Sequence, residues 1–371
     1  MMFWLWLGCV EKHISDTAQS NNMDEQVESC FAENPTIPVI VHGKPYNEDI
    51  SQSSLWKVIY KDGNSIEFEM GRATTGTVQL SSDASWGAVA QENGSIGIFT
   101  LKNASVEVIN PEWVPTYEED TLYVSDMWLD PNQDRVWFVD GNLYETGGLY
   151  YAFLDCITGT LGEVFKFMPS KNGGPIAFVD TPQFNTLFVG KEVDSENQLL
   201  TFDRYDSEST KSTHTVFPDD EAIYASLASN GTDILVGDTN SFSGLGNRVV
   251  HFTLTDESNG TNPTSTLVQT LNIEDPVAIA LQGQWALIAS GFGNALYLYN
   301  TNTQILEETS LSSSSQLPFS IVQHNGKLYV GEYNGIRQVT VSDDGTVSDE
   351  ILMSGSGIEG IFGPFGIQGD W

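Results

Sequence analysis

Short hydrophobic runs that end in a small residue and then a polar one recur along the chain. They read GAVAQ, VWFVD, LFVGK, ILVGD, ALIAS and LYVGE, at residues 87–91, 136–140, 187–191, 234–238, 286–290 and 328–332. Each run has an anchor near its middle: Val89, Val139, Val189, Val236, Ile288 and Val330. Successive anchors lie 50, 50, 47, 52 and 42 residues apart. This spacing indicates a structural repeat of roughly fifty residues.

Each run is the second in a series of four short segments. Around Ile288, PVAIALQG (276–283) precedes the run, NALYLYN (294–300) follows it and ILEETSL (305–311) closes the unit. The segments are rich in Val, Ile, Leu and Tyr and are separated by turn residues, which is typical of β-strands. No stretch shows a convincing helical stripe. Four antiparallel strands at this period predict a propeller blade, because so small a sheet buries its faces only against neighbours.

Six complete units fit between about residues 77 and 353, which leaves one segment at each end. SLWKVIYKDGNSIEFEM (54–70) reads as a hairpin around Asp62 and Gly63, and IEGIFGPFGIQ (358–368) can supply two strands. Together they would form a seventh blade and leave no permanently open strand edge. The sequence therefore predicts an all-β, seven-bladed β-propeller of four-stranded antiparallel blades over residues 54–371, with its ring closed by N- and C-terminal strands that share one blade.

The turns between first and second strands resemble those of a known family. LSSDASWGAVA (80–90), LDPNQDRVWFV (129–139), LASNGTDILVG (227–237) and HNGKLYVGE (324–332) look like degenerate forms of a Ser-Pro-Asp-Gly turn followed by a Tyr-Val strand. That combination is used by bacterial YVTN-type and lactonase-like seven-bladed propellers. The resemblance covers most of residues 54–371. It implies a fold rather than an activity, because these turns lie on the face away from the usual ligand site.

The charge of the chain excludes one class of partner. Its 371 residues carry 50 Asp and Glu against 15 Lys and Arg, a formal net charge of -35, which repels the phosphate backbone of nucleic acids. This charge favours a solvated acidic coat on a secreted protein, although a cationic partner would account for it as well. We expect a monomer that binds a small ligand or a protein, and no nucleic acid.

The N-terminal sequence MMFWLWLGCV contains an apolar run that is too short to span a bilayer. LWLGC (5–9) resembles a bacterial lipobox, in which a small residue precedes the cysteine that becomes lipidated. The resemblance implies that residues 1–9 are a signal remnant, that Cys9 carries a lipid, and that residues 10–53 form a polar tether and extension. The protein would then belong to the bacterial cell envelope and touch the membrane only through this anchor. The alternative is an apolar tail with a buried thiol.

The other cysteines, Cys30 and Cys156, could form one disulfide in an oxidising compartment. The sequence has no Cys-x-x-Cys motif and no His pair at ligand spacing, which excludes a zinc site. It also has no Gly-x-Ser-x-Gly elbow and no Walker-type phosphate loop.

In a propeller, first strands begin and second strands end at the same face, around the mouth of the central channel, where ligands usually bind. Projecting the sequence onto this rule gathers acidic residues and one amide at the mouth: Asp126, Asp140, Glu192, Asp220, Glu221, Asp238, Asn240, Glu274, Asp275, Glu332 and Glu359. Lys191 and Arg248 are the few nearby cations, and each is as suited to neutralising a neighbour as to binding a substrate.

A ring of carboxylates can hold Ca²⁺, a hard cation that takes six to eight oxygen ligands. Lactonase-like relatives that use a metal hold it with acidic and amide residues from different blades, and the resemblance gives this part to Asp238, Asn240 and Glu332. The alternative is a water-filled funnel of solvated charges. Relatives that act on phosphorylated lactones are expected to need basic groups, which are scarce at this mouth.

GDTNSFSGLGNRV (237–249) is the most unusual loop, because it is long, Gly-rich and carries Phe242 ahead of Arg248. It is either a long turn or a lid that contacts a ligand over the channel mouth. Two functions remain. The favoured one is a non-catalytic surface lipoprotein whose propeller binds a ligand or partner. The alternative is a hydrolase of lactones or sugar esters, in which a bound divalent cation polarises a carbonyl and activates water.

Overall fold

The computed structural model describes residues 39–43, 54–74, 78–81, 84–102, 105–130, 135–141, 147–155, 160–169, 174–179, 181, 184–191, 197–203, 212–217, 224–239, 247–255, 264–315, 317–333, 335–354 and 365–368. Over these ranges the chain consists of β-strands and turns, with one short 3-10 helix, η1 (Ser310–Ser313). In the part of the chain so described, no helix has the length and apolar character that crossing a membrane requires.

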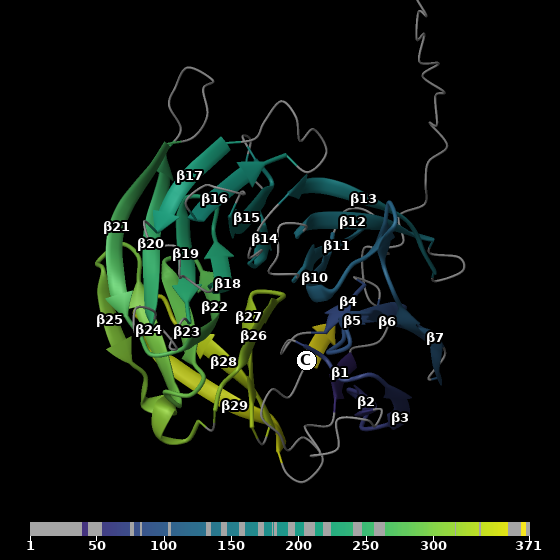
Figure 1. Ribbon diagram of the computed structural model, residues 1–371. Coiled ribbons are helices and arrows are strands. Elements are labelled where there is room, and N and C mark those ends of the chain that lie inside the picture. The colour runs from purple at the N-terminus through teal and green to yellow at the C-terminus, as the bar shows by residue number, and fades with distance from the viewer. Residues whose placement is uncertain are drawn as a thin grey trace, which may run out of the picture.

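Seven four-stranded antiparallel sheets form the ring seen in Figure 1, which confirms the predicted seven-bladed β-propeller. Six sheets use consecutive strands. Their bounds, from the channel outward, are β4 (Gln79–Leu80), β5 (Trp86–Ala90), β6 (Ile96–Lys102) and β7 (Ser105–Trp113) in blade 1; β10 (Val124–Leu129), β11 (Arg135–Asp140), β12 (Gly148–Asp155) and β13 (Thr160–Pro169) in blade 2; β14 (Ile176–Phe178), β15 (Thr186–Lys191), β16 (Asn197–Phe202) and β17 (Ser212–Phe217) in blade 3; β18 (Tyr224–Ser229), β19 (Asp233–Asp238), β20 (Arg248–Thr255) and β21 (Thr264–Asn272) in blade 4; β22 (Pro276–Gln282), β23 (Trp285–Ser290), β24 (Ala295–Asn300) and β25 (Ile305–Glu308) in blade 5; and β26 (Ser320–His324), β27 (Lys327–Glu332), β28 (Gly335–Val341) and β29 (Val347–Ser354) in blade 6.

First strands surround the channel, because they contact the first strands of neighbouring blades: β4 with β10, β14 with β18, β18 with β22 and β22 with β26. A small hairpin of β8 (Thr116–Tyr117) and β9 (Asp120–Thr121) lies on the connection between blades 1 and 2. We call the face at which first strands begin and second strands end the mouth face.

The closing blade combines both ends of the described chain in the order β3-β2-β1-β30. The C-terminal strand β30 (Phe365–Gln368) is innermost, followed by β1 (Val39–Gly43), β2 (Ser54–Tyr60) and β3 (Ser65–Met70). Figure 1 shows the C-terminal end beside β1 near the centre of the ring. The predicted closure by shared terminal strands is confirmed.

One bound of the predicted closure was wrong. The strand β1 falls within residues 10–53, which were predicted to form a tether and extension, so the propeller begins before residue 54. The predicted hairpin, β2 and β3, shares its sheet with β30 as expected, and β1 lies between β2 and β30. The physical reason is burial: every residue of β1 is buried, since strands flank it on both edges and blades cover both its faces.

The hydrophobic core lies between blades, because alternate side chains of a strand point to opposite neighbours. In the closing blade, Val41 packs with Val89 and Phe99 of blade 1, whereas Ile40 packs with Tyr329 and Ile336 of blade 6. Second strands are therefore apolar along most of their length, which produces the repeated run in the sequence.

Turns on the face opposite the mouth link successive blades. Asn230 Nδ2 donates to the Gly283 carbonyl at 3.1 Å, and Gln282 Nε2 donates to the Gly326 carbonyl at 2.5 Å. Asn325 and Gly326 both have positive φ, 48° and 70°, as a two-residue hairpin turn of the Asn-Gly type requires. The turns at Asn230 and at Asn325–Gly326 carried the family resemblance, and these two hydrogen bonds link blades.

Candidate functional site

A polar residue stands at or next to the mouth-face end of the second strand in every blade. In order from the closing blade these are His42, Gln91, Asp140, Lys191, Asp238, Ser290 and Glu332. The six whose side chains are described are all buried, and the side chain of Lys191 lies outside the described part of the chain. The repeat thus places one polar residue per blade at the mouth, and four of the seven were predicted from the sequence.

Three of these residues bond to the backbone of their own blade. Asp140 Oδ1 accepts the Tyr123 amide at 3.0 Å, Ser290 donates its hydroxyl to the Glu274 carbonyl, and Gln91 Nε2 donates to the Pro111 carbonyl at 2.7 Å. Buried polar groups are stable only with such partners. Asp140 and Ser290 therefore fasten the segments that lead into first strands.

Asp238 is held by Arg248, the residue opposite it in the β19–β20 register. The guanidinium Nε and one terminal nitrogen each lie 3.1 Å from Asp238 Oδ2, and the carboxylate side chain is only 1% exposed. Of the two roles expected for Arg248, the structure shows neutralisation of a neighbour. Asn240 and Phe242, on the same loop, lie outside the described residues.

Glu332 is held by Arg337, which is 3% exposed. Arg337 Nε lies 3.0 Å from Glu332 Oε1, and a terminal nitrogen donates to Oε2 at 3.1 Å. The same guanidinium contacts Asp349 at 2.5 Å and the hydroxyl and carbonyl oxygens of Ser314 at 3.0 and 3.1 Å. Burial raises the pKa of Glu332 above its ordinary value, and the Arg337 hydrogen bond and charge oppose that rise.

These pairings bear on the predicted calcium site. Asp238 and Glu332 belong to blades 4 and 6, and each is committed to an arginine of its own blade. Throughout the described ranges, no three His, Cys, Asp or Glu side chains gather as they would around a metal ion. A site built from Asp238, Asn240 and Glu332 stays a prediction, because Asn240 is not described.

Asp275 orders a turn that presents an aromatic ring. Its Oδ2 accepts the Phe292 amide at 2.9 Å, and its own amide donates to Asn247 Oδ1 at 3.0 Å. Burial raises the pKa of Asp275, the Phe292 hydrogen bond opposes this, and the neighbouring Glu274 adds to it. Phe292 is 65% exposed and meets Phe319 edge-on, with ring centroids 5.8 Å apart.

Tyr123 is a second exposed ring on the mouth face, at 44% exposure. Its hydroxyl donates to the Glu92 carbonyl at 2.5 Å, and Asp140 holds its amide. The ring packs on Gly94, where a Cβ would lie 2.4 Å from Tyr123 Cδ2, so glycine is required beneath it. Tyr123 and Phe292 were not predicted from the sequence. The signal available was an aromatic residue in the segment just before a first strand or just after a second one.

Asp126 differs from the other described mouth carboxylates. It lies on the first strand β10, is half-buried, and accepts the Met127 amide at 2.8 Å. Burial raises its pKa to about 7, and that amide only partly opposes the effect. Among the described residues, no arginine, lysine or histidine forms an ion pair with it.

The remaining predicted site residues lie outside the described part of the chain and stay predictions. They are Glu192, Asp220, Glu221 and Glu359 at the mouth, and the cysteines Cys9, Cys30 and Cys156. Glu274 is described and exposed at the start of blade 5.

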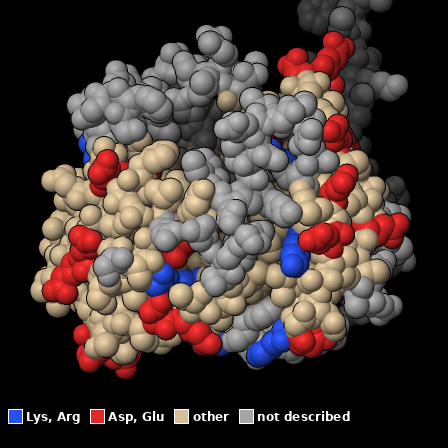
Figure 2. Space-filling model, turned by 90° about the horizontal axis from the view of Figure 1, so that it is seen from below, with Lys and Arg blue, Asp and Glu red and all other residues tan. Residues whose placement is uncertain are grey.

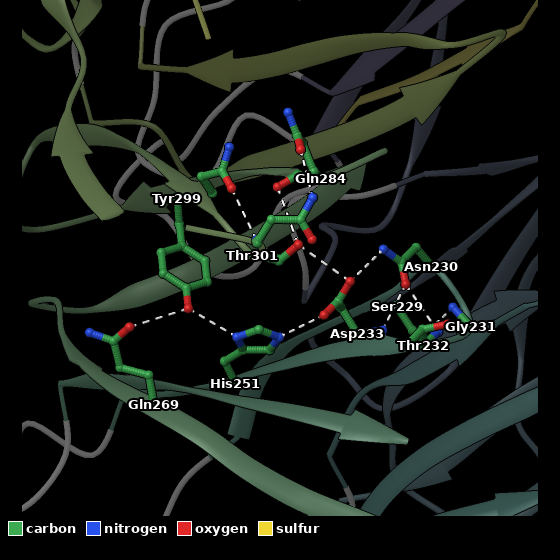
Figure 3. Close-up of polar contacts among 12 residues, drawn as sticks. Ser229, Asn230, Gly231, Thr232, Asp233, His251, Gln269, Gln284, Tyr299 and Thr301 are labelled. Atoms are coloured by element: carbon green, nitrogen blue, oxygen red, sulfur yellow. Dashed lines mark hydrogen bonds and ion pairs between the residues drawn. The ribbon is translucent and has the colours of Figure 1, made fainter. Parts of the chain in front are cut away.

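A buried acid–histidine–tyrosine chain lies at the other end of β19 (Figure 3). His251 Nε2 is 2.9 Å from Asp233 Oδ1, and His251 Nδ1 is 2.9 Å from the Tyr299 hydroxyl. Asp233 Oδ2 also accepts from Asn230 Nδ2 at 3.0 Å and from the Thr301 hydroxyl at 3.3 Å. His251 is fully buried, and the chain joins blade 4 to blade 5. Its residue types suggest catalysis, but its burial makes it a strut between blades.

No protein-family model matches the chain, and no curated protein matches it closely enough to count as a relative. Solved structures do match. The periplasmic gluconolactonase of Pseudomonas aeruginosa is 13% identical with a TM-score of 0.60, over 90% of this chain and 99% of that one. A protein from Lactobacillus plantarum is 13% identical with a TM-score of 0.58, over 90% and 100%. A candidate 6-phosphogluconolactonase from Bacteroides fragilis is 13% identical with a TM-score of 0.56, over 89% and 98%. At such identities the likeness shows the fold alone: this chain folds as a seven-bladed β-propeller.

Proposed function

We propose that the protein is a ligand-binding propeller whose site is the mouth of the central channel. One observation carries the proposal: the mouth face presents two exposed aromatic rings, Tyr123 and Phe292, together with a half-buried carboxyl group, Asp126, that no described cation neutralises. Exposed aromatic rings and a partly desolvated acid on one face are typical of binding surfaces.

The buried carboxylates Asp140 and Asp275 hold the backbone of the residues that carry the two exposed rings. Asp140 fixes the backbone of Tyr123, and Asp275 fixes the backbone of Phe292. Both rings are therefore set before a ligand arrives, which lowers the entropy lost on binding. The acidic residues that sequence reasoning assigned to ligand contact would act mainly as the framework for two aromatic contacts.

A lactone hydrolase is the second candidate, favoured by the fold likeness to a gluconolactonase and by Asp126. A carboxyl group with a pKa of about 7 suits general-base catalysis near neutral pH. Asp126 would take a proton from water as the water oxygen bonds to the lactone carbonyl. The ring C–O bond would then break, and the ring oxygen would take the proton back.

Thermal-shift screening of a small-molecule library, followed by calorimetry on the hits, tests the binding function. We expect Tyr123→Ala and Phe292→Ala each to weaken a mouth ligand about tenfold or more, because exposed aromatic anchors dominate binding energy. Ile305→Ala is the matched control, since Ile305 is 54% exposed but lies on the outermost strand β25. Hits whose affinity survives both aromatic substitutions would place the site elsewhere.

Turnover separates the two candidates. A pH-stat assay with gluconolactone, corrected for spontaneous opening, should show no enzyme-dependent rate if the protein only binds ligands. A rate that Asp126→Asn abolishes would establish the hydrolase instead.

We further propose that the protein acts at the bacterial cell envelope through a lipid on Cys9. The lipobox-like LWLGC sequence supports this, and it lies outside the described residues. Cys9→Ser should move the protein from the membrane fraction to the soluble fraction. Unchanged partitioning would contradict the anchor.

A further inference from the structure

Strand register identifies equivalent positions on the first strands of four blades. Asp126 pairs with Val139, Ser226 with Gly237, Ala278 with Ala289 and Ser320 with Gly331. Each partner directly precedes the polar residue that ends its second strand. At this position blades 4, 5 and 6 carry a serine or an alanine, and blade 2 carries an acid.

The small residues at this position allow neighbouring blades to pack together. Ser226 donates its hydroxyl across the blade boundary to the Pro276 carbonyl at 2.8 Å, and an ionised carboxylate cannot donate such a bond. Alanine also occupies the position, so the fold does not depend on a polar side chain there. Asp126 is therefore unfavourable for folding in its charged form, because burial opposes ionisation. An acid that the repeat does not need, on the strand that lines the channel, points to a ligand.

The backbone around Asp126 is fixed by its neighbours. The β10–β11 register skips Ser125, whose carbonyl accepts the Thr74 hydroxyl at 3.1 Å and whose own hydroxyl donates to the Val139 carbonyl at 3.3 Å. Such bulges re-aim the next side chain and occur beside sites. Similar register shifts occur in β18 and β22, so the acid itself, and not the bulge, is what distinguishes blade 2.

We infer that the channel mouth takes an organic cation, such as a primary ammonium, and that Asp126 is the carboxylate that receives it. This inference rests on the proposed binding function. A single carboxylate suits an ammonium, which gains one charged hydrogen bond. The exposed rings of Tyr123 and Phe292 on the same face can add a cation–π contact. Ca²⁺ would need six to eight oxygens.

An anionic ligand is disfavoured by the surrounding charges. Arg72 follows β3 by two residues, Arg248 begins β20 and Arg337 is the third residue of β28. Each pairs with a carboxylate: Glu92, Asp238 and Glu332. The net charge of -35 attracts cations from solution. Figure 2, turned by 90° from the view of Figure 1, shows red acidic side chains spread over the molecule with smaller groups of blue basic side chains between them.

We expect the ionisation of Asp126 to control cation binding near neutral pH, because the strands packed against β10 contribute few other titratable groups. Of the strands packed against β10, β4 and β5 carry no titratable residue. The third, β11, carries Asp140, which bonds to the Tyr123 amide, and Arg135 at its opposite end.

Calorimetry with benzylammonium on the full chain, with benzyl alcohol as the uncharged isostere, tests the inference. We expect the affinity for benzylammonium to rise about tenfold between pH 6 and pH 8, as Asp126 ionises. Asp126→Ser should weaken binding at pH 8 at least about tenfold and remove the pH dependence. Glu307→Ser, which removes one charge from an exposed site on β25, should leave both unchanged. Benzyl alcohol should show no pH dependence.

The stability of the serine variant gives an independent readout. Because Ser226 and Ser320 occupy the equivalent position, Asp126→Ser should melt at the same temperature as the wild type or higher at pH 8. A melting temperature several degrees lower would make Asp126 a structural residue and overturn the inference. Equal benzylammonium binding by wild type and variant, or none by either, would also overturn it. If library ligands are still found whose binding depends on Tyr123 and Phe292, the proposed binding function holds without the organic-cation inference. If the screen finds no such ligand, both the binding function and the inference are contradicted.

Discussion

His251 Nε2 lies 2.9 Å from Asp233 Oδ1 at a boundary between blades, where the imidazole has no contact with solvent. The imidazole thus bonds to an acid on its own blade and to Tyr299 on the next. Losing either end leaves a buried nitrogen without a partner.

Replacing His251 with Phe should lower the free energy of unfolding by about 1–3 kcal/mol, because Asp233 and Tyr299 both lose a partner. Tyr299→Phe is the control that keeps the bond between His251 and Asp233 and removes the hydroxyl that bonds to His251 and Gln269. Guanidinium unfolding measures both. If His251→Phe unfolds at the wild-type midpoint, the strut does not hold the blades together.

Acid should weaken this strut in a defined window. The His251 hydrogen bond is the main cause that lowers the pKa of Asp233. Asp233 therefore contributes its full stabilisation above the unfolded pKa of about 3.9, and this is lost as the pH falls through the lower folded pKa. Between pH 5 and pH 3, the wild type should lose more stability than Asp233→Asn. Parallel curves for the two proteins would contradict the linkage.

Arg337→Met should destabilise the protein by about 3–5 kcal/mol, because it leaves Glu332 buried without its cation. Loss of the cation raises the pKa of Glu332 further. In the variant, unfolded Glu332 ionises near pH 4.3 while the folded residue keeps its proton, so stability should fall as the pH rises above that value. Adding Glu332→Gln should recover part of the loss. Unfolding measured from pH 4 to pH 8 would show this, and a loss independent of pH would contradict it.

Gly366→Val should prevent the ring from closing properly. A Cβ at Gly366 would lie 2.5 Å from the Val78 carbonyl oxygen, a backbone atom that cannot move aside cheaply. We expect destabilisation of about 1–3 kcal/mol, as for other overpacked sites. Gly162→Ala is the control, since its nearest neighbour would be 3.6 Å away. Equal melting temperatures for the two variants would show that β30 is not needed for closure.

Calcium should bind more tightly once an arginine is removed. A metal at Asp238 would have to displace Arg248, so we expect about 1 mM Ca²⁺ to raise the melting temperature of Arg248→Met more than that of the wild type. A saturable rise in the wild type that Asp238→Asn removes would instead establish the calcium site predicted from the sequence.

The blade count followed from the spacing of Val89 to Val330, because a buried second strand needs apolar residues wherever the repeat places it. The strand β1 was missed although VIVHG fits the same pattern. Its first-strand partner, β30, lies at the other end of the chain, so no four-segment series surrounds it.

The site was less predictable, because it depends on pairings that sequence spacing does not reveal. Arg248 and Arg337 neutralise Asp238 and Glu332 from the third strand of each blade, ten and five residues further along. Asp126 was named with the other acids, but its distinction from Ser226 requires the strand register.

The closure of the ring also means that β1 is synthesised long before its innermost partner, β30. About 320 residues separate β1 from its innermost partner β30, so at ~5–20 residues per second the ribosome needs roughly 15–60 s to supply that partner. During this interval the inner edge of β1 has its hydrogen-bonding groups unpaired, with Val39, Ile40 and Val41 beside them. A nascent chain in this state can pair with a β-edge of another chain. The growing protein thus depends on whatever shields that edge until its last strand emerges.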